Sequence, residues 1–187
     1  MKSMKKIFSI FIILSLVFCF VGCADNQNSS KSAGKVLVVY YSATGNTENV
    51  AKIIASNTNA DVFEITPEKE YTADDLNWRN NQSRVCIEHD NPDKRNVELV
   101  KVTPDNFGDY DTVFIGYPIW WGIAAWPVDN FIKGNDFTGK TVIPFCTSAS
   151  SDLGESGELL RKAAGSGEWK QGKRFNENPS SEEVKNW

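Results

Sequence analysis

Beyond its first few dozen residues, the chain alternates nearly continuous hydrophobic runs with segments whose apolar residues repeat at helical spacing. The runs at 35–41 (KVLVVYY), 111–117 (DTVFIGY) and 140–146 (KTVIPFC) are rich in β-branched and aromatic residues. Such runs are typical of strands that are buried on both faces of a parallel sheet. Two weaker runs, at 61–66 and 169–175, predict the second and the fifth strand in chain order.

Helical periodicity connects the predicted strands. The four predicted helices are 47–58, 126–133, 157–164 and a final helix that begins after Ser180. Ser180 and Glu183 form a capping box, and Pro127 and Gly134 are typical of a helix start and a helix end. Five strands that alternate with helices predict an α/β fold with a doubly wound, five-stranded parallel sheet. Ligands of such sheets bind beyond the carboxyl ends of the strands.

The connection between the second and third predicted strands, residues 67–110, is long and highly charged. Its weak periodicity predicts one helix near 74–85 within an irregular insertion. The chain's single histidine, His89, lies here between two acidic residues. One histidine cannot supply the usual set of catalytic zinc ligands, so we interpret its surroundings as a solvated loop.

The first 34 residues have the pattern of an export signal. Three lysines precede an apolar run at 7–21, which is short for a membrane-spanning helix. The end of this run, Phe20-Val21-Gly22-Cys23, resembles the lipobox of bacterial lipoproteins, although the family prefers leucine at the position of Phe20. We therefore expect a signal peptide at 1–22, a lipid on Cys23, a flexible tether at 23–34 and a folded domain at 35–187.

Composition supports a single globular domain that does not bind nucleic acid. Hydrophobic residues make up 41% and charged residues 24% of the 187 positions, as in ordinary packed proteins. Residues 1–34 hold four of the 20 basic and one of the 24 acidic residues, so the remaining 16 basic and 23 acidic residues leave a net charge of −7. A domain of that sign repels phosphate backbones. Cys86 and Cys146 could form a disulfide after export or remain two separate buried thiols.

The segment after the first predicted strand, Ser42-Ala43-Thr44-Gly45-Asn46-Thr47, places hydroxyl groups and a glycine at the start of a helix. Backbone N–H groups at a helix start attract an anion, and the absence of Lys and Arg here suits a phosphate monoester. The alternative is an ordinary polar turn in which Asn46 or Thr47 caps the helix. A phosphate-loop pattern at 134–141 (GNDFTGKT) follows a helix and enters a strand, so we interpret it as a chance match.

The segment after the first strand also carries a family resemblance. Residues 41–47 (YSATGNT) resemble the FMN phosphate loop of flavodoxins, whose pattern is Ser/Thr-x-Thr-Gly-x-Thr. The resemblance continues through 116–122 (GYPIWWG) and 147–154 (TSASSDLG), as in flavodoxin-like proteins with a Pro-x-Trp-Trp loop. It implies a sheet of order 2-1-3-4-5 with noncovalently bound FMN at the switch point. The leader and the 67–110 insertion depart from the family pattern.

Three loops make up the cofactor site that this resemblance implies. The second loop comprises Pro118, Ile119, Trp120, Trp121 and Gly122, and its tryptophans either stack on a planar ring or are core residues, as we expect for Trp126. The third loop comprises Thr147, Ser148, Ala149, Ser150, Ser151 and Gly154, and it either offers N–H groups to the flavin or is a solvated loop that caps the next helix. An indole in an acidic domain disfavours the anionic reduced flavin and lowers its potential.

These observations predict an FMN-binding electron carrier that is lipid-anchored on the extracytoplasmic face of the cell membrane. Its partner would be a redox protein or a small acceptor at the membrane surface. An FMN-dependent NAD(P)H or quinone reductase and a lipoprotein that binds flavin without redox function are the two alternatives. Neither a Ser-His-Asp set nor a carboxylate pair stands out, so the chemistry is assigned to the flavin rather than to a side chain.

Overall fold

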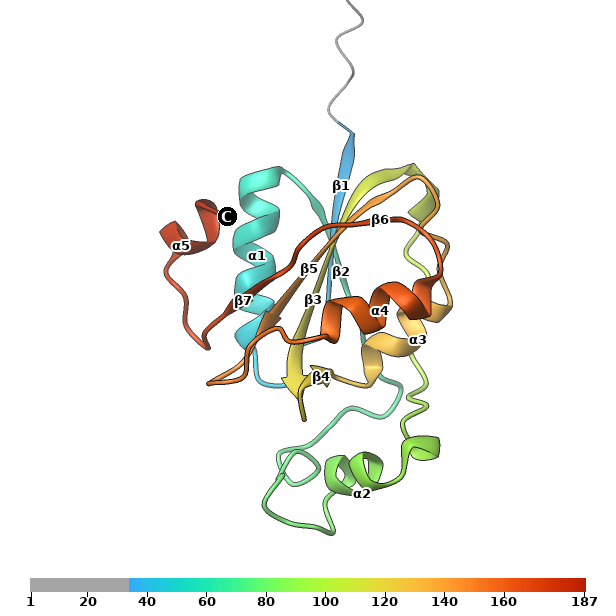
Figure 1. The fold of residues 1–187 in the computed structure, drawn as a ribbon, viewed down its shortest axis with the longest axis vertical. Coiled ribbons are helices and arrows are strands. Elements are labelled where there is room, and N and C mark those ends of the chain that lie inside the picture. The colour runs from blue at the N-terminus through green and yellow to red at the C-terminus, as the bar shows by residue number, and fades with distance from the viewer. Residues whose placement is uncertain (1–33) are drawn as a thin grey trace, which may run out of the picture. The chain divides into compact units, whose positions relative to one another are not determined.

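The buried hydrophobic runs form a parallel sheet around two central strands. In the computed structural model, which describes residues 34–187, the sheet has the order β2-β1-β3-β5-β6 (Figure 1). The strands are β1 (Lys35–Tyr40), β2 (Asp61–Glu64), β3 (Tyr110–Trp120), β4 (Ile123–Ala124), β5 (Thr141–Thr147), β6 (Glu168–Trp169) and β7 (Lys173–Phe175). Among these described strands, only β4 is antiparallel to its neighbour. The predicted order 2-1-3-4-5 is confirmed, with β5 in fourth place and β6 with β7 in fifth.

The predicted fifth strand is divided in two, and within residues 34–187 the sheet has seven strands rather than five. β6 pairs with Thr141 and Val142, whereas β7 pairs with the segment that begins at Phe145. Pro144 lies between these two pairings and has no N–H to donate to a ladder, which interrupts the strand. The remaining additional strand, β4, folds back on the end of β3.

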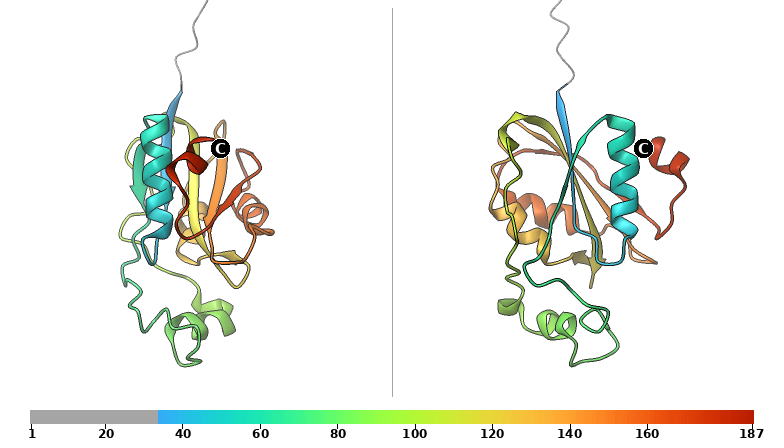
Figure 2. Two further views of the ribbon diagram at one scale, coloured as in Figure 1. Left: turned by 90° about the vertical axis from the view of Figure 1, so that its left-hand side faces the viewer. Right: turned by 180° about the vertical axis from the view of Figure 1, so that it is seen from behind.

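Helices cover both faces of the sheet. On one face lie α1 (Asn46–Thr58) and α5 (Ser181–Lys185), and on the other lie α3 (Pro127–Lys133) and α4 (Ser156–Ala164) (Figures 1 and 2). Successive residues of a strand point to opposite faces, so Val38 packs under α1 while Val39 joins the larger core under α3 and α4. Two short 3₁₀ helices, Pro92–Lys94 and Phe107–Asp109, lie in the connection from β2 to β3.

The insertion between β2 and β3 differs from the prediction. Its helix, α2, spans Arg84–Asp90, and the predicted helix at 74–85 is wrong because most of that segment forms turns. Asn77 and Asn80 accept hydrogen bonds from the backbone N–H groups of Arg79 and Gln82, and such local bonds compete with a helix. Figure 1 shows α2 beyond the carboxyl end of β3, at the edge of the sheet where ligands bind.

Several other sequence predictions can be compared with the structure. The Ser180 hydroxyl accepts a hydrogen bond from the N–H of Glu183 at 3.1 Å, which confirms the cap of α5. Trp187 contacts the sheet through edge-on packing against phenylalanines of β3, β5 and β7. Cys86 and Cys146 are both buried and both free thiols. The 134–141 segment connects α3 to β5, so its phosphate-loop pattern is a chance match.

The predicted signal peptide, Cys23 and all but the last residue of the predicted tether lie outside the described residues. Within residues 34–187, no helix has the length and apolar character needed to cross a membrane.

Candidate functional site

The segments that follow β1, β3 and β5 meet in one cleft at the carboxyl edge of the sheet. The cleft consists of two cavities of about 270 and 360 Å³ that share five lining residues, Trp78, Ile119, Trp120, Ser148 and Ala149. Thr44 and Asn46 line the end near α1, whereas Trp121 and Ser150 line the other end. The cleft is therefore elongated, with a polar end at a helix start and an aromatic end.

The structure brings most of the predicted site residues to this cleft. Those that line it are Ala43, Thr44, Asn46, Pro118, Ile119, Trp120, Trp121, Thr147, Ser148, Ala149, Ser150 and Ser151. Five others lie outside its lining, namely Ser42, Gly45, Thr47, Gly122 and Gly154. Three of these five, Ser42, Gly45 and Thr47, belong to the first loop, and Ser42 lines a separate cavity of about 150 Å³ instead.

The polar end of the cleft has the features of an anion site. Gly45 is the N-cap of α1 with φ of 86°, a left-handed conformation that glycine adopts readily, and no side chain caps the helix. The prediction that Asn46 or Thr47 could be the cap is therefore wrong. The Ser42 hydroxyl oxygen is buried and has no hydrogen-bond partner among the residues that the structure describes. An uncapped helix start beside an unpartnered hydroxyl leaves donors available for a phosphate group.

The Thr47 side chain instead joins the first loop to the third. Its hydroxyl lies 2.7 Å from the hydroxyl of Thr147, and both residues are almost fully buried. A buried hydrogen bond between two loops fixes their separation. The width of the polar end therefore depends on this threonine pair.

The tryptophan loop is a tight hairpin. Trp120 pairs with Ile123 across a two-residue turn in which Trp121 and Gly122 both have positive φ, 45° and 83°. Such turns match the twist of antiparallel strands but normally carry Asn or Gly at the first position. A bulky residue in this conformation is uncommon and is strained unless its surroundings hold it. Gly122 is therefore a turn residue rather than part of the cleft wall.

The two tryptophans have different surroundings. Trp120 lines both cavities and packs edge-on against Tyr41, Tyr71 and Trp126 at centroid distances of 5.7, 5.1 and 5.4 Å. Trp121 lines only the aromatic end, is 44% exposed, and stacks on two rings, those of Trp126 and His89. Trp120 is consequently the indole that reaches the whole cleft. Trp126 is buried, as predicted.

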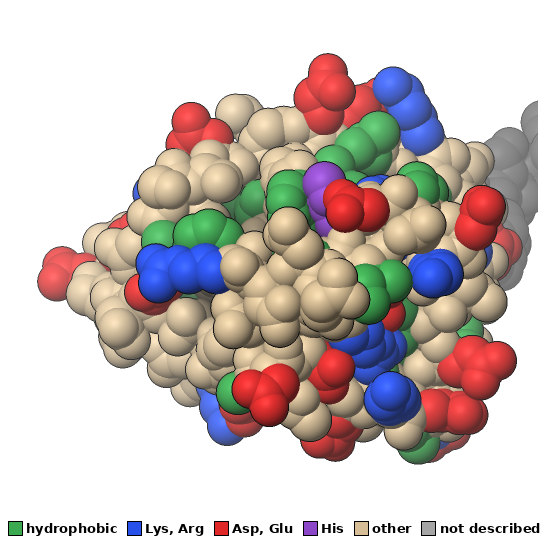
Figure 3. Space-filling model, turned by 90° about the horizontal axis from the view of Figure 1, so that it is seen from below, with side chains coloured by type: hydrophobic (Ala, Val, Ile, Leu, Met, Phe, Trp, Pro, Cys, Tyr) green, Lys and Arg blue, Asp and Glu red, His purple; other side chains and the backbone are tan. Residues whose placement is uncertain are grey.

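His89 corrects another prediction. It lies in the last turn of α2 rather than in a solvated loop, and its ring stacks on Trp121 at 4.4 Å. Figure 3 shows the single histidine beside hydrophobic side chains on the face of the molecule seen from below. Within residues 34–187 there is no group of three potential ligands that could hold a metal ion. The histidine therefore helps to hold the hairpin tip.

The third loop is held by a side chain that the sequence did not indicate. Arg174 of β7 donates hydrogen bonds to the carbonyl oxygens of Ser148 and Ala149 at 2.8 and 2.9 Å. Because Arg174 binds these carbonyl oxygens, the loop keeps one conformation at the cleft. Gly154 lies farther along and lines a separate cavity beside α4. Burial raises the pKa of the Cys146 thiol to about 12, so this neighbour of the loop is not a nucleophile.

Three further cleft residues were missed by sequence reasoning. Leu76 and Trp78 come from the insertion, and Glu177 follows β7. Trp78 is 65% exposed and lines both cavities, so it stands at the mouth of the cleft. A tryptophan in an otherwise polar segment was the one available signal. The position of Glu177 in the sequence does not indicate that it lies at the cleft.

A buried ion pair in the insertion supports Trp120. The Arg84 guanidinium and the Tyr71 hydroxyl donate to the two oxygens of the Glu88 carboxylate at 2.7 and 2.6 Å. Arg84 also lies over the Tyr71 ring at 3.8 Å, and Tyr71 in turn packs against Trp120. Burial and the bond to Glu88 hold the pKa of Tyr71 far above its usual range, so it remains a neutral donor.

We expect Glu88→Gln to lower the free energy of unfolding by about 2 kcal/mol, because Arg84 loses its charged partner in a buried site. Chemical denaturation with tryptophan fluorescence measures this change. The matched control is Glu158→Gln, which removes an exposed ion pair with Arg161 and should leave the denaturation midpoint unchanged. Equal effects of the two substitutions would show that the Glu88 network is not structural.

Comparison with known proteins identifies the fold. A family model described as Flavodoxin matches residues 35–187. The chain belongs to the flavodoxin family. Crystal structures of two proteins that are provisionally assigned as flavoproteins resemble this flavodoxin. The protein from Bacteroides uniformis is 40% identical over 82% of this chain and 97% of its own, with a TM-score of 0.75. The protein from Bacteroides eggerthii is 38% identical over 82% and 94%, with a TM-score of 0.73.

A third structure, of a Lactobacillus acidophilus flavoprotein in complex with FMN, shares the fold with this flavodoxin. It is 21% identical over 83% of this chain and 99% of its own, with a TM-score of 0.61. No curated protein matches the chain. The elongated cleft fits a flavin phosphate, because its polar end lies at an uncapped helix start and its other end is aromatic.

Proposed function

We propose that this flavodoxin binds FMN noncovalently in the cleft and exchanges electrons with a redox partner. The observation that carries the proposal is the convergence of three loops on one cleft, which has an uncapped helix start at one end, Trp121 at the other and Trp120 along both cavities. The FMN complex of the Lactobacillus acidophilus flavoprotein, which has the same fold, supports this choice of flavin.

Each part of the cleft has a separate role in this proposal. The N–H groups at the start of α1 hold the phosphate beside Thr44 and Asn46, and Trp120 packs against the ring. The loop that Arg174 braces presents its backbone N–H groups to the polar edge of the ring. Trp78 restricts the entry of water at the mouth of the cleft. Bound flavin supplies one- and two-electron chemistry that no side chain of the cleft offers.

We further propose that the protein is exported and anchored by a lipid on Cys23 at the extracytoplasmic face of the cell membrane. The apolar run at 7–21 and the cysteine that follows it support this location. The redox partner would then be a protein or a small acceptor at the membrane surface. Mass spectrometry of the protein from membranes should show a diacylglycerol-modified Cys23 as the new N-terminal residue, and an unmodified Met1 in that fraction would contradict the proposal.

Titration with FMN and with riboflavin tests the cofactor. We expect FMN to shift its visible band and to quench tryptophan fluorescence at saturation, because the ring lies against indoles. Riboflavin lacks the phosphate, so it should bind at least about tenfold more weakly if the α1 start holds that group. Equal affinities would show that the first loop is an ordinary turn, and no binding of either compound by folded protein would refute the proposal.

A flavin reductase is the second candidate, and the exposure of Trp78 and Trp121 favours it. These side chains are 65% and 44% exposed, so a small acceptor could approach the aromatic end of the cleft. Steady oxidation of NAD(P)H with a soluble quinone would establish the reductase. Electron exchange only with a partner protein would establish the carrier, and a flavin that neither reacts with dithionite nor exchanges electrons would indicate a binding protein without redox function.

We expect Glu177→Gln to strengthen FMN binding roughly two- to fivefold at low salt, because Glu177 places a negative charge in the cavity that receives the phosphate. The gain should shrink at high ionic strength, where exposed charges are screened. Fluorescence titration at two salt concentrations measures both effects. Glu182→Gln is the control, since Glu182 lies in the first turn of α5 outside the cleft lining. A gain for riboflavin as large as that for FMN would contradict the assignment of the phosphate end.

A further inference from the structure

The insertion places a tryptophan at the cleft whose ring has no aromatic partner. Trp78 is 65% exposed and lines both cavities of the cleft. Trp120 packs against three aromatic rings and Trp121 against two, whereas the Trp78 ring packs against no aromatic ring within residues 34–187. A large apolar side chain that is exposed at an aromatic cleft is typical of a residue that a ligand or a partner covers.

The backbone of Trp78 is fixed within the insertion. Its N–H donates to the carbonyl oxygen of Leu76 at 2.8 Å, and its own carbonyl oxygen accepts from the Cys86 thiol of α2 at 3.4 Å. The side chains of Asn77 and Asn80 stabilise the turns on either side of it. Because the backbone is already held, a ligand that contacts the indole orders little additional chain, which lowers the entropic cost of binding.

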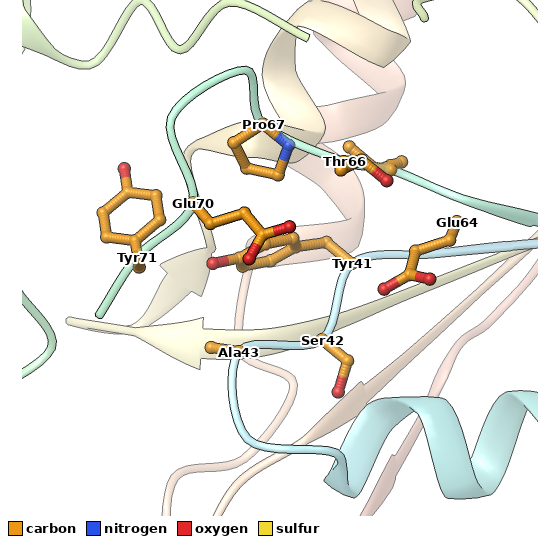
Figure 4. Close-up of a pocket in the computed structure, with 9 residues that line it drawn as sticks. Tyr41, Ser42, Ala43, Glu64, Thr66, Pro67, Glu70 and Tyr71 are labelled. Atoms are coloured by element: carbon orange, nitrogen blue, oxygen red, sulfur yellow. The ribbon is translucent and has the colours of Figure 1, made fainter. Parts of the chain in front are cut away.

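Trp120 forms a separate and well-packed part of the cleft wall. Tyr41 and Tyr71 pack edge-on against it, and these two tyrosines also line the cavity of about 150 Å³ (Figure 4). The rings of Trp78 and Trp120 line the same two cavities without packing against each other. A flat aromatic ligand can therefore lie between them and contact both indoles.

The other walls of the cleft offer no free aromatic ring. The third loop lines the cleft with a threonine, three serines and an alanine, at positions 147–151. Trp121 is already engaged, because it stacks on His89 and Trp126. Of the three aromatic side chains that line the cleft in the described part of the chain, only Trp78 lacks an aromatic partner. A ligand ring would supply that partner.

We propose that Trp78 packs against the face of the flavin ring that Trp120 leaves uncovered, so that the insertion completes the cofactor site. This inference rests on the proposed binding of FMN and deepens it. A ring held between two indoles has no free face on which the nicotinamide of NAD(P)H can stack. Electrons then pass at the edge of the ring that lies toward Trp121, which favours a carrier over an NAD(P)H reductase.

Fluorescence titration of the purified full-length protein with FMN, riboflavin and lumiflavin tests the proposal. Lumiflavin has a methyl group in place of the ribityl phosphate chain, so it reports contacts with the ring alone. We expect Trp78→Leu to weaken the binding of all three compounds roughly five- to tenfold, because a stacking ring is lost. Trp78→Phe retains a ring and should keep each affinity within about threefold of the parent protein.

The matched control is Trp187→Leu, which should leave all three affinities unchanged. Trp187 is 39% exposed and lines neither cavity of the cleft. Far-ultraviolet circular dichroism of the flavin-free variants verifies that each is folded. A change in affinity for Trp187→Leu as large as that for Trp78→Leu would overturn the proposal, because the loss would then not be specific to the cleft.

Limited proteolysis provides a second measurement in the parent protein. Arg79 is exposed, and its guanidinium lies 4.9 Å from the centroid of the Trp78 ring. We expect saturating FMN to slow tryptic cleavage after Arg79 at least about fivefold, because the bound ring holds Trp78 and the turn around it. Cleavage after Lys170, which is exposed outside the cleft lining, should not change. Equal cleavage after Arg79 with and without FMN would contradict the contact.

Three results of the titrations would overturn the role of Trp78 while leaving the FMN proposal intact. Equal binding by Trp78→Leu and the parent protein would show that the indole stays in solvent. A loss confined to FMN and riboflavin would place Trp78 over the ribityl phosphate chain. A loss that disappears in a Trp120→Leu background would show that Trp78 acts through Trp120, since independent contacts contribute additively to the binding free energy. Absence of flavin binding by the folded parent protein would instead refute both proposals.

Discussion

Replacing Asn46 with aspartate is expected to weaken FMN binding at least about tenfold while leaving the protein as stable as before or more stable. Asn46 is the first residue of α1 and lines the polar end of the cleft. A carboxylate at that position repels the phosphate, and this repulsion offsets the attraction of the phosphate to the helix start. The same carboxylate interacts favourably with the helix dipole, so the stability of the protein is not reduced. Fluorescence titration and thermal denaturation measure the two effects separately.

The control for this substitution is Asn49→Asp, which introduces the same charge in the same helix. Asn49 is exposed and does not line the cleft. We expect FMN affinity to change less than about threefold in this variant, because solvent screens the more distant charge. Riboflavin affinity should be the same in both variants and in the parent protein. A loss of riboflavin binding in Asn46→Asp would mean that the residue shapes the cleft rather than holding the phosphate end.

Replacing Trp120 with leucine should weaken the binding of FMN and riboflavin equally, by roughly ten- to a hundredfold. Stacking of a base on an aromatic side chain contributes about 1–3 kcal/mol, and a flavin ring has a comparable aromatic face. Trp120 is the indole that lines both cavities, whereas Trp121 already stacks on Trp126 and His89. Trp121→Leu should therefore cost less affinity than Trp120→Leu. Titration of both variants with both flavins measures the difference.

Trp120 also packs against Tyr41 and Tyr71, so lost affinity must be separated from lost structure. Trp120→Phe retains an aromatic ring and should keep affinity within about threefold of the parent protein. Near-ultraviolet circular dichroism of the flavin-free variants reports the packing of the aromatic cluster directly. If Trp121→Leu proves more damaging than Trp120→Leu while both remain folded, the ring lies at the hairpin tip rather than along Trp120.

The sequence predicted the parallel strands because their signal is local. Each strand is a short run of β-branched and aromatic residues, and the alternation of strands with helices indicates a parallel sheet, whose strand order came from the family resemblance. Residues 42–47 were also identified from local spacing, since the strand, the glycine and the helix are consecutive. The break in the last strand was missed because it depends on Pro144 of a different strand, which pairs beside it.

The insertion shows where local signals fail. The predicted helix does not form where it was expected, because asparagine side chains accept hydrogen bonds from the backbone in turns. These bonds compete with a helix, and the spacing of apolar residues does not reveal that competition. Cys86 and Cys146 illustrate the same limit, because sequence left open whether they pair and only the fold showed two separate free thiols. His89 was assigned to a solvated loop, although it ends α2 and stacks on Trp121.

The sequence alone therefore determined the fold class, the strand order through the family resemblance, and the three loops that face the ligand edge. Only the tertiary structure decided that Trp120 rather than Trp121 reaches the whole cleft, and that Trp78, Arg174 and Glu177 belong to the site. The reason is physical. Periodicity records which face of an element is buried, whereas contacts between distant segments depend on how completed elements pack, and that information is distributed over the whole core.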